Sequence, residues 1–310
     1  MSAVKLVEVG PRDGLQNEKV KIPTAAKVAF VDALSETGVD EIEVSAFVAP
    51  RRVPQLDDAE AVFRDIRRTD AVVYSALVPN ERGLARALAC GVDKIAVFTA
   101  VSEIFNQNNI HTSFDGSLRR FRPVIRRAKS AGRPVRGYLS TAFWCAFEGR
   151  IPPQKAISAA EALFEIGVDE VSISDTVGKA TPEEVAQLLE SLLRRIAPER
   201  IAMHFHDTFG HAAANVRRSW DYGVRIFDAS VGGLGGCPFS PGATGNVATE
   251  TVAAALTDQG AEIDVDLRKL AHARQLLNPY LGKERRARSP ESGRTCETCD
   301  YFAGEICCGR

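Results

Sequence analysis

Four similar short segments recur at junctions between helical and strand-like sequence. They read "TGVDEIEV" (37–44), "CGVDKIAV" (90–97), "IGVDEVSI" (166–173) and "YGVRIFDA" (222–229). In each one a glycine ends an amphipathic run, and an apolar, β-rich run begins two or three residues later. Recurrence of one junction at several places indicates repeated β/α units, and this limits the fold more than any other feature of the sequence.

Eight strand-like runs are expected, with helical patterns between them. They cover residues 5–10, 41–47, 71–78, 94–100, 135–143, 170–176, 201–207 and 226–233. Residues 23–38 and 181–198 are predicted helices, the second with Thr181 as its N-cap and Pro182 in its first turn. Eight alternating units predict an α/β fold of the (β/α)8 TIM-barrel class. The alternative, a doubly wound open sheet, is disfavoured because "GPRDGLQNE" after the first strand is not a GxGxxG turn.

Domain boundaries follow from the same pattern. Residues 1–283 are predicted to form the catalytic barrel, with an extra C-terminal helix over 264–282 that covers an end of the barrel. Residues 284–310 have no periodic apolar face and are predicted to be a polar, cysteine-rich tail.

Composition narrows the classes of function. With 45% hydrophobic residues, 25% charged residues and a formal net charge of −1, the chain is typical of a soluble enzyme and offers no charge-based case for nucleic acid or membrane partners. No apolar run approaches the roughly 20 residues that span a bilayer. Because a strand is expected almost at the first residue, no signal peptide is predicted, and the expected location is cytoplasmic.

The stretch "MHFHDTFG" (203–210) holds two of the five histidines. Residues i and i+2 of a strand share a face, so His204 and His206 are expected to point together into the mouth at the carboxyl ends of the barrel strands. Asp13 and Asn246 are predicted to add oxygen ligands there. This set suits Mg2+ or Mn2+ better than Zn2+. The alternative is a pair of hydrogen-bonded core histidines. Of the others, His211 and His272 are predicted to be surface or packing residues in helices, and His111 is predicted to lie in a loop after the fourth strand.

Four further residues are expected at the same mouth. Arg12 is a fixed cation able to stabilise an enolate or a carboxylate, unless it belongs to a solvated turn. Cys237 lies in "VGGLGGCPFSPGATGN" (231–246), which is predicted to be a mobile lid that delivers a proton donor or acceptor; the alternative is a plain connector. Glu43 lies within the second strand, and Asp175 ends the sixth.

Three motifs together resemble those of the 3-hydroxy-3-methylglutaryl-CoA (HMG-CoA) lyase family, a metal-dependent group of TIM barrels. They are "VEVGPRDGLQNE", "HFHDT" and "GGLGGCPFSPGATGN", and the resemblance covers roughly residues 4–282. It implies retro-Claisen cleavage of an acyl-CoA substrate into acetyl-CoA and a 3-oxo acid, and a homodimer is expected. The metal ligands implied are Asp13, His204, His206 and Asn246. The catalytic residues implied are Arg12, Glu43, Asp175 and Cys237, with His204 or Asp175 as the general base.

Two segments depart from the pattern expected of that family. They are "STAFWCAFEG" (140–149) and "NNIHTS" (108–113), and both are predicted near the barrel mouth, where they bear on the choice of acyl group. A lyase for citramalyl-CoA, or for a longer branched 3-hydroxyacyl-CoA, is therefore an alternative. A Claisen-condensing acyltransferase of the same superfamily is less favoured, and a non-enzymatic binding module is ranked last. Leucine degradation is one expected biological role.

Four of the seven cysteines lie in the last fifteen residues: Cys296, Cys299, Cys307 and Cys308. A CxxC followed by a vicinal pair suits a zinc site of four thiolates, disulfides between subunits, or an exposed tail without function. The pattern does not decide among these three interpretations.

Overall fold

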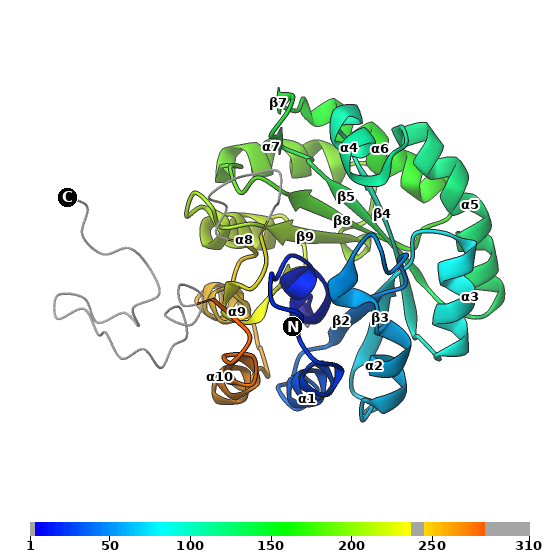
Figure 1. Cartoon of the computed structure of the whole chain (residues 1–310). Coiled ribbons are helices and arrows are strands. Elements are labelled where there is room, and N and C mark those ends of the chain that lie inside the picture. Colours follow the sequence, from blue (N-terminus) through cyan, green and yellow to red (C-terminus); the bar gives the residue numbers. More distant parts are fainter. Residues whose placement is uncertain (1–3, 237–244, 283–310) are drawn as a thin grey trace.

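The computed structural model describes residues 4–236 and 245–282. Within them, eight parallel strands close into a barrel in the order β1-β10-β9-β8-β5-β4-β3-β2 (Figure 1). These strands are β1 (Lys5–Glu8), β2 (Glu41–Ala46), β3 (Val73–Leu77), β4 (Lys94–Ala100), β5 (Val135–Ser140), β8 (Glu170–Asp175), β9 (Ile201–Phe205) and β10 (Ile226–Ala229). The prediction of a TIM barrel is confirmed.

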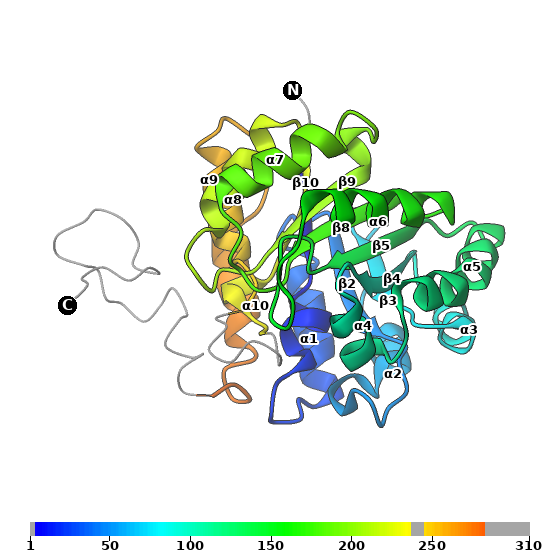
Figure 2. The same ribbon diagram turned by 90° about the horizontal axis from the view of Figure 1, so that it is seen from above.

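Helices surround the strands, as the view from above also shows (Figure 2). They are α1 (Thr24–Leu34), α2 (Ala59–Asp65), α3 (Glu81–Ala89), α4 (Glu103–Ile110), α5 (Phe114–Ser130), α6 (Pro153–Glu165), α7 (Pro182–Leu192), α8 (Ala212–Asp221), α9 (Thr249–Thr257) and α10 (Leu267–Gln275). Short 3-10 turns cover Pro54–Leu56, Pro198–Arg200 and Val231–Gly233. No helix in the described part of the chain is both long enough and apolar enough to cross a membrane.

The repeated junctions have a common geometry. Their four glycines, Gly38, Gly91, Gly167 and Gly223, have φ values of 91°, 67°, 102° and 87°, which glycine adopts far more easily than other residues. In three junctions the aspartate two residues after the glycine accepts a hydrogen bond from a backbone N–H at the start of a neighbouring strand. These bonds join Leu6 N to Asp40 (2.8 Å), Tyr74 N to Asp93 (3.0 Å) and Val135 N to Asp169 (2.9 Å). The repeat therefore encodes both the end of a helix and the start of a strand.

The predicted helix start at Thr181 is confirmed. The Thr181 hydroxyl accepts from Glu184 N, and the Glu184 carboxylate accepts from Thr181 N, which is a complete capping box. The helix ends at Leu192, earlier than predicted, and a 3-10 turn at Pro198–Arg200 leads into β9. The capping residues thus mark the start of α7 more sharply than the apolar pattern marks its end.

Some boundaries and one position differ from prediction. The fifth barrel strand ends at Ser140 because Thr141 adopts a left-handed conformation (φ 54°), and a hairpin of β6 (Trp144–Cys145) and β7 (Gly149–Arg150) follows. The last strand ends at Ala229, since Val231–Gly233 turns. The extra helix α10 does not cover an end of the barrel; it packs beside α1, where Leu270 and Ala273 are buried (Figure 1).

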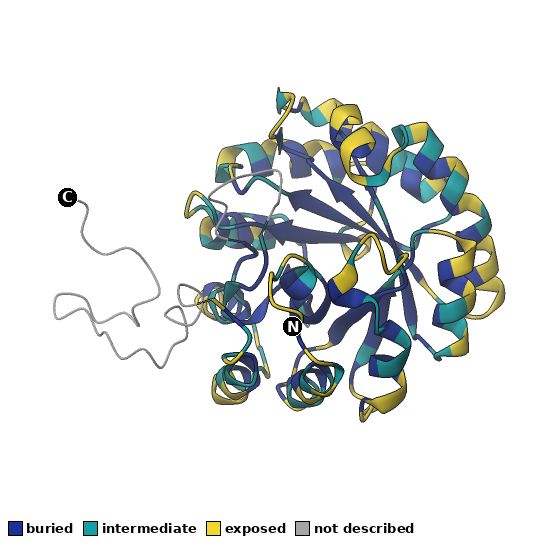
Figure 3. Cartoon of the chain, viewed as in Figure 1, coloured by how far each residue is buried: buried dark blue, intermediate teal, exposed yellow. Residues whose placement is uncertain are grey.

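Burial divides the molecule into an apolar shell and a charged interior. The helix faces toward the strands are buried and their outer faces are exposed (Figure 3). Within the barrel, charged side chains pair between strands. Apart from Arg136 and Glu170, which face each other on the neighbouring strands β5 and β8, these pairs join strands that are not neighbours and so cross the interior. Lys94 Nζ lies 3.0 Å from Glu41 and 2.9 Å from Glu170, and Arg136 pairs with Glu170 and Asp228. The barrel is therefore filled partly by ion pairs, which hold its strands in register.

Candidate metal centre and active site

Three candidate ligands meet at the carboxyl ends of the strands. Asp13, His204 and His206 each offer a ligand atom, and these atoms all lie within 4.8 Å of one another. Asp13 comes from a π-helical turn at Gly10–Gly14, where the amides of Asp13 and Gly14 both donate to Val9 O. The two histidine rings lie side by side with centroids 5.4 Å apart. Alternation along β9 brings both rings to the same face, as the sequence predicts.

The fourth predicted ligand, Asn246, joins this group through its amide. Its backbone forms an antiparallel bridge with His206, and its Nδ2 donates to Asp13 Oδ2 (2.8 Å) and to Leu234 O (2.9 Å). Because Nδ2 has two acceptors, the amide orientation is fixed. Oδ1 is buried and has no hydrogen-bond partner among the described residues, and the same holds for Nδ1 of His206. Buried acceptors left without partners are costly unless a cation satisfies them, so the donor set fits a metal ion.

The charge states of the site also suit a cation. Burial favours the neutral form of Asp13, but the Arg12 guanidinium and then the two histidines outweigh it and lower its pKa to about 2. Burial, with the neighbouring His204, lowers the pKa of His206 to about 4. At neutral pH the carboxylate is therefore ionised and the His206 imidazole is neutral, which are the forms that bind metals.

Arg12 is buried and held between two acids. Its Nε donates to Glu43 Oε2 at 2.6 Å, and its Nη1 donates to Asp13 Oδ1 at 2.8 Å. Although burial opposes its charge, these carboxylates hold the pKa of Arg12 above its ordinary value. Its guanidinium carbon lies 5.4 Å from the centroid of the Tyr138 ring. The arrangement fixes a permanent cation beside the candidate ligands.

Asp175 lies at the end of β8, and its backbone oxygen accepts from His206 N. Its carboxylate is turned toward the following loop, where it accepts from Gly178 N (3.1 Å) and Ala180 N (2.8 Å). Burial raises its pKa to about 6 despite these bonds. The structure therefore places Asp175 next to the ligand strand, while its side-chain hydrogen bonds to Gly178 and Ala180 shape the loop before α7.

Sequence reasoning missed the residues that lie beneath His204. Asp228 Oδ2 is 3.3 Å from His204 Nδ1, and Asp228 also binds Ser172 and Arg136. Burial alone would favour the neutral form of Asp228, but the positive charge of Arg136 outweighs this effect, and the pKa of Asp228 is lower than its ordinary value. The signal was present in the sequence, since an acid inside "IFDAS" and an arginine inside "VRGYLS" are unusual in strands that are otherwise apolar.

The remaining histidines are arranged differently. His111 ends α4 in a left-handed conformation and contacts Arg52, His211 precedes α8, and His272 lies in α10. None of the three belongs to the metal cluster that the described residues form. Cys237 and the tail cysteines Cys296, Cys299, Cys307 and Cys308 lie outside the described residues.

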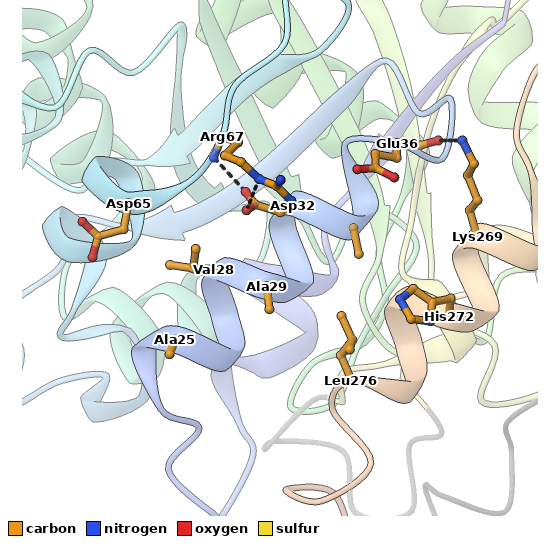
Figure 4. A pocket seen from close by; sticks show the side chains of 11 residues that line it. Ala25, Val28, Ala29, Asp32, Glu36, Asp65, Arg67, Lys269, His272 and Leu276 are labelled. Carbon is orange, nitrogen blue, oxygen red and sulfur yellow. Dashed lines mark hydrogen bonds and ion pairs between the residues drawn. The ribbon is translucent and has the colours of Figure 1, made fainter.

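A groove of about 480 Å³ lies on the outer side of the barrel, between α1 and α10 (Figure 4). Ala25, Val28 and Leu276 give it an apolar floor. Two of its charged groups have partners, since Arg67 binds Asp32 and Lys269 Nζ donates to the backbone oxygen of Glu36. It contains none of the candidate site residues, so its position does not compete with the mouth of the barrel as a site for chemistry.

Comparison with known proteins gives consistent matches over most of the chain. Residues 3–277 match the HMGL-like family model. A hydroxymethylglutaryl-CoA lyase of Pseudomonas mevalonii is 46% identical over 93% of this chain and 96% of its own length. A 3-hydroxy-3-isohexenylglutaryl-CoA/hydroxymethylglutaryl-CoA lyase of Pseudomonas aeruginosa is 45% identical, with shares of 93% and 96%.

A solved structure agrees with these sequence matches. The crystal structure of an HMG-CoA lyase from Brucella melitensis has a TM-score of 0.87 and 45% identity, and the match covers 90% of this chain and 99% of that one. The family model, the related sequences and the solved fold agree over the segment that carries the candidate site. The chain belongs to the HMGL-like family.

Proposed function

We propose that the chain is a divalent-metal-dependent carbon–carbon lyase that cleaves HMG-CoA to acetyl-CoA and acetoacetate. The observation that carries this proposal is the group formed by Asp13, His204, His206 and Asn246, in which buried acceptor atoms are left open beside the fixed cation of Arg12. The family relationship supports it, because the related proteins are named as lyases of this substrate. Acyl-CoA is accordingly the proposed small-molecule partner.

The reaction divides naturally among the proposed residues. A general base removes the proton of the 3-hydroxyl group, the C2–C3 bond breaks as the ketone of acetoacetate forms, and the electron pair passes to the thioester enolate. Arg12 stabilises the enolate oxygen, with Glu43 holding the guanidinium in place. Cys237 then protonates the enolate carbon to give acetyl-CoA. A divalent ion bound by the four ligands supplies Lewis-acid stabilisation of the substrate's hydroxyl and carboxylate oxygens.

The proposed base is either His204 or Asp175. Burial raises the pKa of Asp175 to about 6. Its carboxylate is therefore ionised at neutral pH, and because its pKa lies close to that pH it is basic enough to accept a proton. His204 belongs to the ligand group itself; since its Nδ1 faces Asp228, it can act as the base only while its Nε2 is not bound to the metal. The proposed metal is Mg2+ or Mn2+, because half of the ligand set is oxygen.

A second candidate substrate is citramalyl-CoA or a longer branched 3-hydroxyacyl-CoA. The observation that favours it is that one departing segment contacts the start of the helix whose end belongs to the other. Glu148, in the β6–β7 hairpin, accepts from the Ser102 hydroxyl (2.6 Å) and from Ile104 N (3.0 Å) at the start of α4, and α4 leads into residues 108–113. The two segments are therefore coupled. A condensing acyltransferase has no comparable observation in its favour.

The test offers the purified chain HMG-CoA and citramalyl-CoA separately, with Mg2+, and identifies the products. Acetyl-CoA plus acetoacetate from the first, at the higher kcat/KM, supports the proposal; a preference for the second moves the substrate to citramalyl-CoA. Cys237→Ala is expected to lose turnover, while Cys90→Ala, which removes a thiol on α3's C-terminal side, keeps it. If neither substrate yields products, the proposed activity is contradicted.

We also propose that the enzyme is a cytoplasmic homodimer and that it serves leucine degradation. The support is the membership of the chain in its family, some of whose related lyases are named as cytoplasmic. Sedimentation of the purified chain tests the homodimer directly, and a measured mass equal to that of one chain contradicts it.

A further inference from the structure

The two histidines of the metal centre differ in what lies behind them. Asp228 on β10 stands opposite His204 in the strand register, and its Oδ2 lies 3.3 Å from His204 Nδ1. Nδ1 of His206, two residues along the same strand, has no hydrogen-bond partner among the described residues. Among the described residues, His204 is therefore the imidazole with a carboxylate against one of its ring nitrogens, whereas the open Nδ1 of His206 is an acceptor left for a cation.

Asp228 is itself held in one orientation. Its Oδ2 accepts from the Ser172 hydroxyl at 2.8 Å, and its Oδ1 pairs with the Arg136 guanidinium. Both Asp228 and Arg136 are almost fully buried. With a donor on each oxygen, the carboxylate has no freedom to turn away from His204.

The support for Asp228 continues through the barrel interior. Arg136 Nε lies 3.1 Å from Glu170, which pairs with Lys94, and Lys94 in turn pairs with Glu41. Glu41 is the first residue of β2, whereas His204 lies near the carboxyl end of β9. Charges of alternating sign thus connect the amino-terminal end of the barrel with a ligand at its mouth.

We infer that Asp228 is a positioning residue that holds His204 with its proton on Nδ1 and its Nε2 lone pair directed to the metal centre. An ionised carboxylate only accepts hydrogen bonds, so the nitrogen that faces it carries the proton and leaves the other nitrogen free to bind a cation. The part that concerns the metal rests on the proposed metal centre. The tautomer of His204 does not, because it exists in the metal-free protein.

The substitution Asp228→Asn tests this with a predictable sign. Arg136 donates toward one oxygen of residue 228, so the amide oxygen stays there and the NH2 group turns to His204 Nδ1. A donor at that position requires an unprotonated Nδ1 and moves the imidazole proton to Nε2, the nitrogen needed by the metal. The matched control is Glu41→Gln, which neutralises a buried acid of the same ion-pair chain at the opposite end of the barrel.

The experiment has two readouts. Nitrogen-15 NMR of histidine-labelled, metal-free protein, above the ordinary imidazole pKa of ~6.5, reports the tautomer, and calorimetric titration with Mn2+ reports affinity. Wild type and Glu41→Gln are expected to show the Nδ1–H form of His204. Asp228→Asn is expected to show the Nε2–H form and to bind Mn2+ about 10–100-fold more weakly.

The inference would be overturned by an Nε2–H tautomer in the wild type, or by an Asp228→Asn variant with unchanged tautomer and unchanged Mn2+ affinity. An equal shift in Glu41→Gln would also overturn it, since the effect would then belong to the barrel interior in general. Failure of wild type to bind Mn2+ contradicts the proposed metal centre instead, and the NMR result still decides the inference. The wild-type spectrum serves even if a variant does not fold.

Discussion

At the scale of single residues, the site depends on charged groups placed where water is excluded. Glu8, at the end of β1, is fully buried and accepts hydrogen bonds from Gly10 N, Val231 N and the Thr249 hydroxyl. It therefore ties the turn that carries Arg12 and Asp13 to the segment that follows β10. Burial raises its pKa from 4.5 to about 8, although these hydrogen bonds oppose the rise.

The raised pKa of Glu8 predicts a pH dependence of stability. Folded Glu8 retains a proton that the unfolded chain releases above pH 4.5, so its contribution to the free energy of unfolding is complete below 4.5 and is lost as pH rises through about 8. Urea unfolding of wild type across this range should show a decline that is smaller in Glu8→Gln. Glu199→Gln, which makes the same substitution at an exposed position, should behave as wild type. Parallel curves for wild type and Glu8→Gln would contradict the prediction.

Local sequence patterns predicted which side chains point into the mouth of the barrel, but they did not predict which residues contact those side chains from neighbouring strands. The period of two along β9 was enough to bring His204 and His206 together, and strand ends predicted Asp13 and Arg12. Asp228 was missed because its role depends on the register between β9 and β10, which places it opposite His204 and which the sequence pattern does not set. A charge inside an apolar strand was the signal available.

At the scale of elements, the number and order of strands could be predicted, whereas their ends could not. The repeated junctions locate where strands begin, since glycine and the following aspartate act locally there. Strand ends depend on loops that turn under tertiary constraints, as at Thr141 (φ 54°) and after Ala229. The π-helical turn at Gly10–Gly14 likewise has no simple sequence signature, and no helical structure was predicted there.

The segment after β10 packs closely enough to make a prediction about Gly235. Its φ is 120°, and a Cβ there would lie 2.5 Å from Asn246 Nδ2. Gly235→Ala is therefore expected to displace Asn246 and to weaken Mn2+ binding by about tenfold or more, which calorimetric titration measures. The control is Gly132→Ala, which also has positive φ (71°) but no neighbour within 4 Å of the added Cβ. Equal Mn2+ affinity in the two variants would show that Asn246 is not a ligand or is not displaced.

At the scale of the whole molecule, the barrel brings together groups that are distant in the sequence. The Asp13 and Asn246 side chains are in hydrogen-bond contact across 233 positions because β1 and β10 are neighbours in the closed sheet. Ion pairs across the interior and the packing of α10 on α1 also depend on this closure. Closure of the barrel was predictable from the eight repeated β/α units. Because the carboxyl ends of all strands in a closed barrel meet at one mouth, the three separate motifs that resemble the family pointed to one site.

We propose that residues 1–283 form a complete catalytic barrel and that 284–310 is a separate tail. A chain that ends at residue 283 is then expected to keep its circular dichroism spectrum and its kcat/KM within about threefold, because every proposed ligand and catalytic residue precedes that position. A steady-state assay of both chains measures this. Loss of activity with the fold retained would assign the tail a role in the reaction.

The most direct test of the account is the rate of acetyl-CoA release from HMG-CoA as Mn2+ is returned stepwise to chelator-treated protein. The account predicts almost no activity in excess EDTA and a rise that saturates at one ion per chain, since Asp13, His204, His206 and Asn246 form one ligand set. His206→Ala, which removes one ligand without touching Asp228, should abolish the saturation. Full activity in EDTA would contradict the claim that this group is a catalytic metal centre.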